Sequence, residues 1–188
     1  MRTSYITGKA ISLLPALPAF IKTYRLLKKS QWWSREQLEE YQLQQLGKLL
    51  NHAYDNVPYY RRIFDERGLK PKDIQNLGNL QKLPFLTKEV FRDNLYDLRA
   101  RNYPTHKLEY VTTAGSTGPP LGFYYEKGVS RAIEWAFMKT QWDRVGYNLR
   151  DKCAVLRNNV VKSADRGRFW ETTLFGRWLI LSSLTLTS

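Results

Sequence analysis

The 188 residues, of which 43% are apolar, 14% aromatic and 25% charged, describe a globular chain and exclude the collagen-like, low-complexity and disordered classes. This length accommodates one domain of ordinary size. The single cysteine, Cys153, excludes an intramolecular disulfide framework and a cysteine-based zinc site, and it suits a reducing compartment such as the cytoplasm. The longest apolar run, residues 10–21, contains Pro15 and Pro18, is too short to cross a membrane, and lacks the cleavage pattern of a secretory signal.

Thirty basic and seventeen acidic residues give a net charge of +13, which favours anionic partners. The excess is spread over all four quarters of the chain, so no nucleic-acid-binding tail is predicted, and we expect no specific nucleic-acid partner. The densest basic stretch, residues 22–35, surrounds Trp32 and Trp33. It is compatible with peripheral contact to an anionic membrane, or with a solvated face whose two tryptophans pack inward.

Residues 1–106 are expected to form a mostly helical lead-in. Ser34 and Gln37 have the spacing of a capping box, and apolar residues then recur at helical spacing, which predicts a helix over about 35–55. Pro58 suits the first turn of a second helix, and Gly68 is placed to end it. Two short helical starts are predicted at Pro71 and Thr87. Five apolar residues are available for burial beside them: Leu77, Leu80, Leu83, Phe85 and Leu86.

Residues 107–188 are expected to begin an α/β domain that forms one structural unit with the lead-in. Alternating β-branched residues predict a strand over 108–113, and a second strand is predicted over 121–125. Ser130 is placed to cap a helix that ends at Gly146, and further strands are predicted over 153–156 and 178–181. The helix carries seven apolar residues expected to face a core: Ala132, Ile133, Trp135, Ala136, Phe137, Trp142 and Val145. We expect the last strand to leave an unpaired, association-prone edge.

The loop between the first two strands is the segment whose composition suits chemistry. Glycines let backbone N–H groups approach phosphate oxygens, and serine and threonine hydroxyls add further hydrogen bonds; residues 113–118 supply both. The loop is not a Walker motif, because no Gly-Lys-Ser/Thr follows at the required spacing, and no GxGxxG lies near it. Taken alone, the same residues are also compatible with an ordinary turn between strands.

Residues 113–122, Thr-Ala-Gly-Ser-Thr-Gly-Pro-Pro-Leu-Gly, resemble the phosphate-binding signature of the adenylate-forming superfamily, T-S-G-S-T-G-x-P-x-G. Upstream, His-Ala-Tyr-Asp-Asn-Val-Pro-Tyr-Tyr-Arg at 52–61 and Leu-Pro-Phe-Leu-Thr-Lys at 83–88 are similar to the lead-in of one branch, the phenylacetate–coenzyme A ligase and CapK-like proteins. The three segments occur in the order found in that branch. The resemblance extends from about residue 35 onward.

The resemblance implies a ligase that activates a small-molecule carboxylate with ATP and Mg²⁺ as an acyl-AMP and passes the acyl group to a thiol such as coenzyme A. It also assigns five residues to the ATP phosphates: Thr113, Gly115, Ser116, Thr117 and Gly118. Ala114 replaces a usual serine, and Leu121 stands where many members of the superfamily have lysine. The other nucleotide-binding, metal-binding and catalytic segments of the family would lie beyond residue 188. The sequence therefore predicts a truncated α/β ligase that is inactive alone, and the catalytic residues are not assigned.

Other candidate sites have less support. His52 and His106 lack the paired spacing of metal ligands, so no metal site is predicted, and Cys153 is expected to be a small buried residue. The pair at 65–66 is expected to be a solvated helix end, and no Ser/His/Asp order can be assigned. An alternative from another functional class is a non-catalytic basic protein that binds an anionic membrane or nucleic acid.

Overall fold

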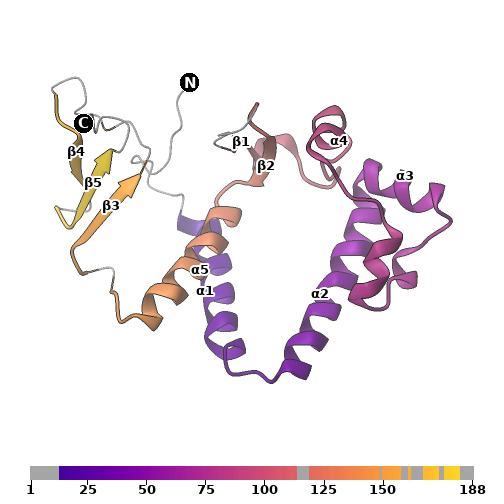
Figure 1. Cartoon of the computed structure of the whole chain (residues 1–188), viewed down its shortest axis with the longest axis horizontal. Coiled ribbons are helices and arrows are strands. Elements are labelled where there is room, and N and C mark those ends of the chain that lie inside the picture. Colours follow the sequence, from indigo (N-terminus) through magenta and orange to yellow (C-terminus); the bar gives the residue numbers. More distant parts are fainter. Residues whose placement is uncertain are drawn as a thin grey trace. The chain divides into compact units, whose positions relative to one another are not determined.

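The computed structural model describes residues 13–113, 119–148, 150–157, 161, 167–173 and 176–182. Two α-helices and a shorter third begin this part: α1 (Leu13–Ser30), α2 (Arg35–Asn56) and α3 (Pro58–Glu66). Short helical turns follow: η1 (Pro71–Asp73), η2 (Leu77–Lys82), α4 (Lys88–Asp93) and η3 (Thr105–Lys107). The remaining elements are β1 (Leu108–Thr112), β2 (Gly122–Glu126), α5 (Val129–Arg144), β3 (Cys153–Arg157), β4 (Trp170–Thr173) and β5 (Trp178–Ser182) (Figure 1).

Residues Ser12–Phe137 form one compact unit, and the chain from Met138 onward belongs to a second. The change from helical lead-in to α/β segment, expected at residue 107, therefore falls inside the first unit. Helix α5 runs across the boundary between the two units.

The capping signals at the start of α2 are confirmed. The Ser34 side chain accepts a hydrogen bond from the Gln37 N–H, and the Gln37 side chain accepts one from the Ser34 N–H. Val57 ends α2 and also starts α3, so a single buried residue makes the corner between the two helices. Gly68 follows α3 with a φ of 62°, a left-handed conformation that glycine adopts without strain.

The core of the first unit lies where α2, α3 and η1 meet. Leu50, Phe64 and Ile74 are buried there. Five partly buried side chains pack around them: Leu46, Tyr54, Leu69, Leu80 and Leu83. The prediction that Leu80 and Leu83 are available for burial is confirmed. The same prediction is wrong for Leu77, which is 42% exposed, and for Phe85, which is 96% exposed.

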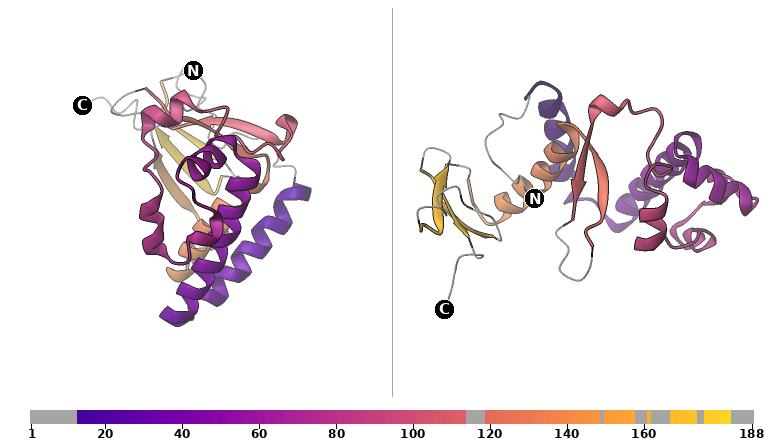
Figure 2. Two further views of the ribbon diagram at one scale, coloured as in Figure 1. Left: turned by 90° about the vertical axis from the view of Figure 1, so that its right-hand side faces the viewer. Right: turned by 90° about the horizontal axis from the view of Figure 1, so that it is seen from above.

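Strands β1 and β2 form an antiparallel hairpin, with Leu108 opposite Glu126 at one end and Thr112 opposite Gly122 at the other (Figure 2). Both predicted strands are thus confirmed. The second unit holds a three-stranded sheet in the order β3-β5-β4, in which β5 pairs parallel with β3 and antiparallel with β4. The expectation of an unpaired edge at residues 178–181 is wrong, because β5 pairs with a strand on each side; β3 and β4 are the outer strands of the sheet as far as the structure describes it.

Helix α5 begins at Val129, two residues before the start that a cap at Ser130 predicts, and Ser130 does not cap it. The Ser130 hydroxyl instead accepts a hydrogen bond from the N–H of Glu126 at the end of β2. The buried stripe of α5 is Ala132, Ala136 and Thr140, four residues apart. Three residues predicted for the core lie off this stripe and are exposed: Ile133, Phe137 and Val145. Gly146 ends the helix with a φ of 75°, as predicted.

Candidate functional site

The hairpin holds both ends of the predicted phosphate loop. Beyond the last strand pair, the Thr113 N–H donates to the Leu121 carbonyl at 2.9 Å, and the Leu121 N–H donates to the Thr113 hydroxyl oxygen at 3.0 Å. The seven residues 114–120 therefore connect two positions that are fixed against each other. Thr113, assigned above to the phosphates, uses one lone pair of its hydroxyl oxygen to close the base of the loop, and its O–H proton has no acceptor among the described residues.

Helix α4 fixes the end of the loop that leads into β2. Arg92 donates a hydrogen bond from its terminal guanidinium nitrogen to the Pro119 carbonyl at 2.8 Å. The Arg92 Nε is buried and has no hydrogen-bond partner among the described residues. Thr87 positions the helix by capping its N-terminus, since its side chain accepts from the Val90 N–H. Arg92 is a residue near the loop that the sequence did not single out, because no motif surrounds it.

Gly122, the last residue of the loop motif, is buried beneath a neighbouring tyrosine. A Cβ atom added at Gly122 would collide with the ring and hydroxyl of Tyr110, which lies on the facing strand. The glycine at this end of the motif thus serves packing of the hairpin, a role separate from phosphate contact.

The other predicted phosphate-binding residues, Gly115, Ser116, Thr117 and Gly118, lie outside the described residues, as does Ala114. Their assignment to the ATP phosphates stays a prediction. What the structure supplies is the frame of the loop: a hairpin closed at Thr113 and Leu121 and tied to α4 through Arg92.

A cavity of about 450 Å³ lies within the first unit, between the helical segments and the hairpin. Its walls are mainly apolar and aromatic: Val57, Tyr60, Phe91, Leu95, Leu98, Ala100, Tyr103, Leu108, Phe123 and Tyr124. Its polar lining is His52, Arg99, Glu126 and Ser130. Burial, and then the neighbouring Tyr59, raise the pKa of Tyr60 above its ordinary value. These walls suit a small apolar or aromatic group. The sequence did not predict the cavity, because its lining is gathered from distant segments.

The histidines and the cysteine occupy ordinary positions. His52 lies half-buried with its ring 6.1 Å from that of Tyr103, and His106 is exposed. Within the described ranges no group of three or more histidine, cysteine, aspartate or glutamate side chains is placed to hold a metal ion. Cys153 is half-buried, which is more exposed than expected. Burial, with the adjacent Cys153 thiol as a second cause, raises the pKa of Tyr147.

The acidic pair at the end of α3 is exposed to solvent, as expected, and Asp65 also takes part in a hydrogen-bond cluster. Asp65 accepts hydrogen bonds from the Tyr54 hydroxyl at 2.9 Å and from the Lys70 ammonium at 3.0 Å. The Lys70 and Tyr54 hydrogen bonds hold the pKa of Asp65 below its ordinary value. All three residues surround the helical core, so this cluster ties α2, α3 and η1 together.

Comparison with curated proteins shows which sequences this chain resembles. Over 88 residues it is 40% identical to the phenylacetate–coenzyme A ligases of Aromatoleum evansii and Escherichia coli (strain K12). Its relatives are phenylacetate–coenzyme A ligases. Each of these matches covers 46% of this chain and 20% of the ligase, and a match to the Thermus thermophilus enzyme, 35% identical over 94 residues, covers 50% and 21%. The chain thus spans about a fifth of the relatives' length, and no family model matches it.

The fold has a counterpart among solved structures. A crystal structure of 2-hydroxyisobutyryl-CoA ligase, in complex with 2-HIB-AMP and CoA, matches 72% of this chain and 30% of the ligase with a TM-score of 0.56 and 22% identity. The predicted resemblance to the phenylacetate–coenzyme A ligases and the predicted α/β fold with a helical lead-in are therefore confirmed. The CapK branch and the cytoplasmic location stay predictions.

Proposed function

We propose that this chain supplies the ATP-phosphate-binding part of an adenylate-forming acid–thiol ligase. The observation that carries the proposal is the identity of 35–40% to phenylacetate–coenzyme A ligases, in a chain whose loop motif sits at the closed end of a hairpin. The fold match to a CoA ligase supports the same reaction class. The substrate would be a small-molecule carboxylate, and coenzyme A would be the acceptor thiol.

The proposed reaction has two steps. A carboxylate oxygen attacks the α-phosphorus of ATP, the bond from that phosphorus to the bridging oxygen breaks, and pyrophosphate leaves with the bonding electrons. The thiolate of the acceptor then attacks the acyl carbonyl of the acyl-AMP, and AMP leaves. The resemblance implies Mg²⁺ alongside ATP, but no residue of this chain is assigned to it.

The contribution of this chain would be made at the β- and γ-phosphates. Ser116 and Thr117 would donate hydroxyl hydrogen bonds, and Gly115 and Gly118 would let backbone N–H groups approach the phosphate oxygens. Thr113 would act from the base of the loop, where its hydroxyl oxygen already accepts from Leu121. The hydrogen bonds at Thr113 and Leu121 fix both ends of the loop before a ligand binds, which favours binding.

The test uses a chimaera in which this chain is followed by the remaining sequence of one of its relatives. Replacing Ser116 or Thr117 by alanine removes a hydrogen bond to a charged oxygen, which contributes about 1.5–3 kcal/mol. We expect kcat/KM for ATP in pyrophosphate exchange to fall about 10- to 100-fold for each change. Ala114→Ser should leave this value unchanged or raise it.

Thr112→Ala is the matched control, since Thr112 is exposed on β1 just outside the loop and should leave ATP use unchanged. The 188-residue chain alone is expected to show no carboxylate-dependent exchange, because its match covers about a fifth of the ligases. Full ATP efficiency in both Ser116→Ala and Thr117→Ala would mean that residues 114–120 are only a connection between strands.

A further inference from the structure

The N-terminal 35 residues have a charge composition unlike the rest of the chain. They contain seven basic residues, and the first acidic residue is Glu36. Four of the basic residues lie on α1: Lys22, Arg25, Lys28 and Lys29. This helix therefore carries only positive side-chain charge, whereas the chain as a whole carries seventeen acidic residues.

One face of α1 is turned toward the protein. Ala16 is buried, and Phe20 and Tyr24 are half-buried with stacked rings 5.7 Å apart. Residues four apart on a helix share a face, so Ala16, Phe20 and Tyr24 define the inward side. The cations point elsewhere: Lys22, Arg25, Lys28 and Lys29 are all exposed.

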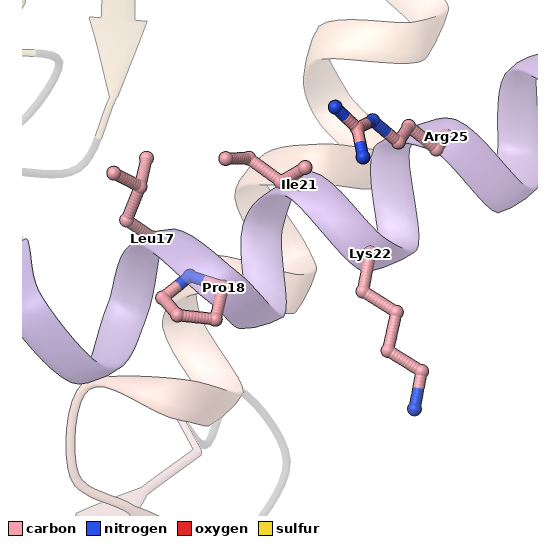
Figure 3. A pocket seen from close by; sticks show the side chains of 5 residues that line it. All are labelled: Leu17, Pro18, Ile21, Lys22 and Arg25. Carbon is pink, nitrogen blue, oxygen red and sulfur yellow. The ribbon is translucent and has the colours of Figure 1, made fainter.

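The exposed side of α1 combines apolar and basic groups in a shallow depression. Its lining consists of Leu17, Pro18, Ile21, Lys22 and Arg25 (Figure 3). Figure 3 shows Leu17, Ile21 and Arg25 extending from one side of the helix, with Pro18 and Lys22 on the other. Leu17 is 50% exposed, and Trp32, just beyond the end of the helix, is 83% exposed. Neither Lys22 nor Arg25 forms an ion pair with a described residue.

We propose that the exposed surface of α1, together with Trp32, docks on an anionic lipid bilayer. Aliphatic side chains next to cations suit the boundary between acyl chains and headgroups, and tryptophan is favoured at the same depth. The lack of acidic residues gives this surface the charge complementary to acidic lipid. Nucleic acid would use the cations but would gain little from Leu17, Pro18 and Ile21. The proposal is independent of the ligase reaction.

Vesicle co-sedimentation of the full 188-residue chain tests this docking. We expect binding to vesicles of equimolar phosphatidylcholine and phosphatidylglycerol, little binding to phosphatidylcholine alone, and weakening by salt. The double variant Lys22→Glu/Arg25→Glu should weaken binding about 10-fold or more. Leu17→Ser should weaken it about threefold or more, because less apolar area enters the bilayer. Vesicles should also shift tryptophan emission to the blue, and Trp32→Phe should remove most of that shift.

Matched controls separate this surface from net charge. Lys48→Glu/Lys72→Glu makes the same change of charge at exposed positions outside α1, and Leu49→Ser makes the same apolar change on α2; neither should alter vesicle binding. Equal weakening by both charge-reversed pairs would overturn the proposal in favour of diffuse attraction. Failure to bind anionic vesicles would overturn it as well. So would binding to duplex DNA as tight as to vesicles and unaffected by Leu17→Ser, which would assign the surface to nucleic acid.

Discussion

A single hydrogen atom in place of a side chain shapes the end of the β1–β2 hairpin. Gly122 lies under the Tyr110 ring, so a methyl group there must push the ring aside. Tyr110 is at the surface and its ring can swing outward, so the loss of folding stability should lie at the lower end of the range for overpacking substitutions.

We expect Gly122→Ala to lower the free energy of unfolding by about 1 kcal/mol, measured by urea denaturation. In a Tyr110→Ser background the same change should cost less, because the obstructing ring is gone. Additive effects of Gly122→Ala and Tyr110→Ser would contradict the packing explanation.

Gly47→Ala is expected to have the opposite effect. Nothing lies within 4 Å of the added Cβ in the middle of α2, so the free energy of unfolding should rise by about 0.5–1 kcal/mol.

At the scale of elements, the start of α2 depends on one side chain more than on any other. The Ser34 hydroxyl oxygen accepts from the Gln37 N–H, and the Ser34 N–H donates in return to the Gln37 side-chain oxygen. Ser34→Ala should lower the free energy of unfolding by about 1 kcal/mol, because an N–H group of the first turn loses its partner. Ser34→Asp retains an acceptor and should lose little. Thermal melts followed by circular dichroism measure both variants, and equal loss in the two would show that the cap is not the cause.

Helices whose ends are marked by a capping residue, a proline or a glycine could be predicted from the sequence. Elements held by contacts between distant segments could not. The bounds of α2 and α3 follow from Ser34, Pro58 and Gly68, whose preferences act within a few residues. Helix α1 was missed because Pro18 lies inside it and removes a backbone donor. Strand β4 was missed because its four residues do not alternate between apolar and polar types. Its pairing with β5 defines the strand.

The candidate site was likewise predictable only in part. Its loop motif could be found from sequence because the residues are contiguous. Segments far apart along the chain meet in the hydrogen bond from Arg92 to Pro119 and in the lining of the cavity. No local sequence pattern predicts either feature. The burial of Ala132 and Ala136 but not of Phe137 also depends on which face of α5 meets other residues.

At the scale of the whole molecule, the outer strands of the three-stranded sheet, β3 and β4 among the described residues, are the candidates for association. Of the two, β3 carries the more exposed aliphatic side chain, Leu156, which is 60% exposed. An exposed strand with an apolar side chain is a site for pairing with another copy. We expect Leu156→Lys to reduce self-association, measured by sedimentation velocity over a concentration series.

Leu49→Lys makes the same substitution at 61% exposure on helix α2 and should leave association unchanged. Equal reduction by both variants would point to net charge as the cause. A wild-type chain that stays monomeric throughout the series would show that this edge does not pair.

The corner at Val57 has a consequence for how the first unit opens. Because one buried residue both ends α2 and begins α3, and the core formed by Leu50, Phe64 and Ile74 spans both helices and η1, the helices cannot lose structure one at a time. Their backbone amides should exchange with solvent deuterium as one cooperative group. The hairpin is not part of that cluster, so its amides are expected to exchange separately from that group.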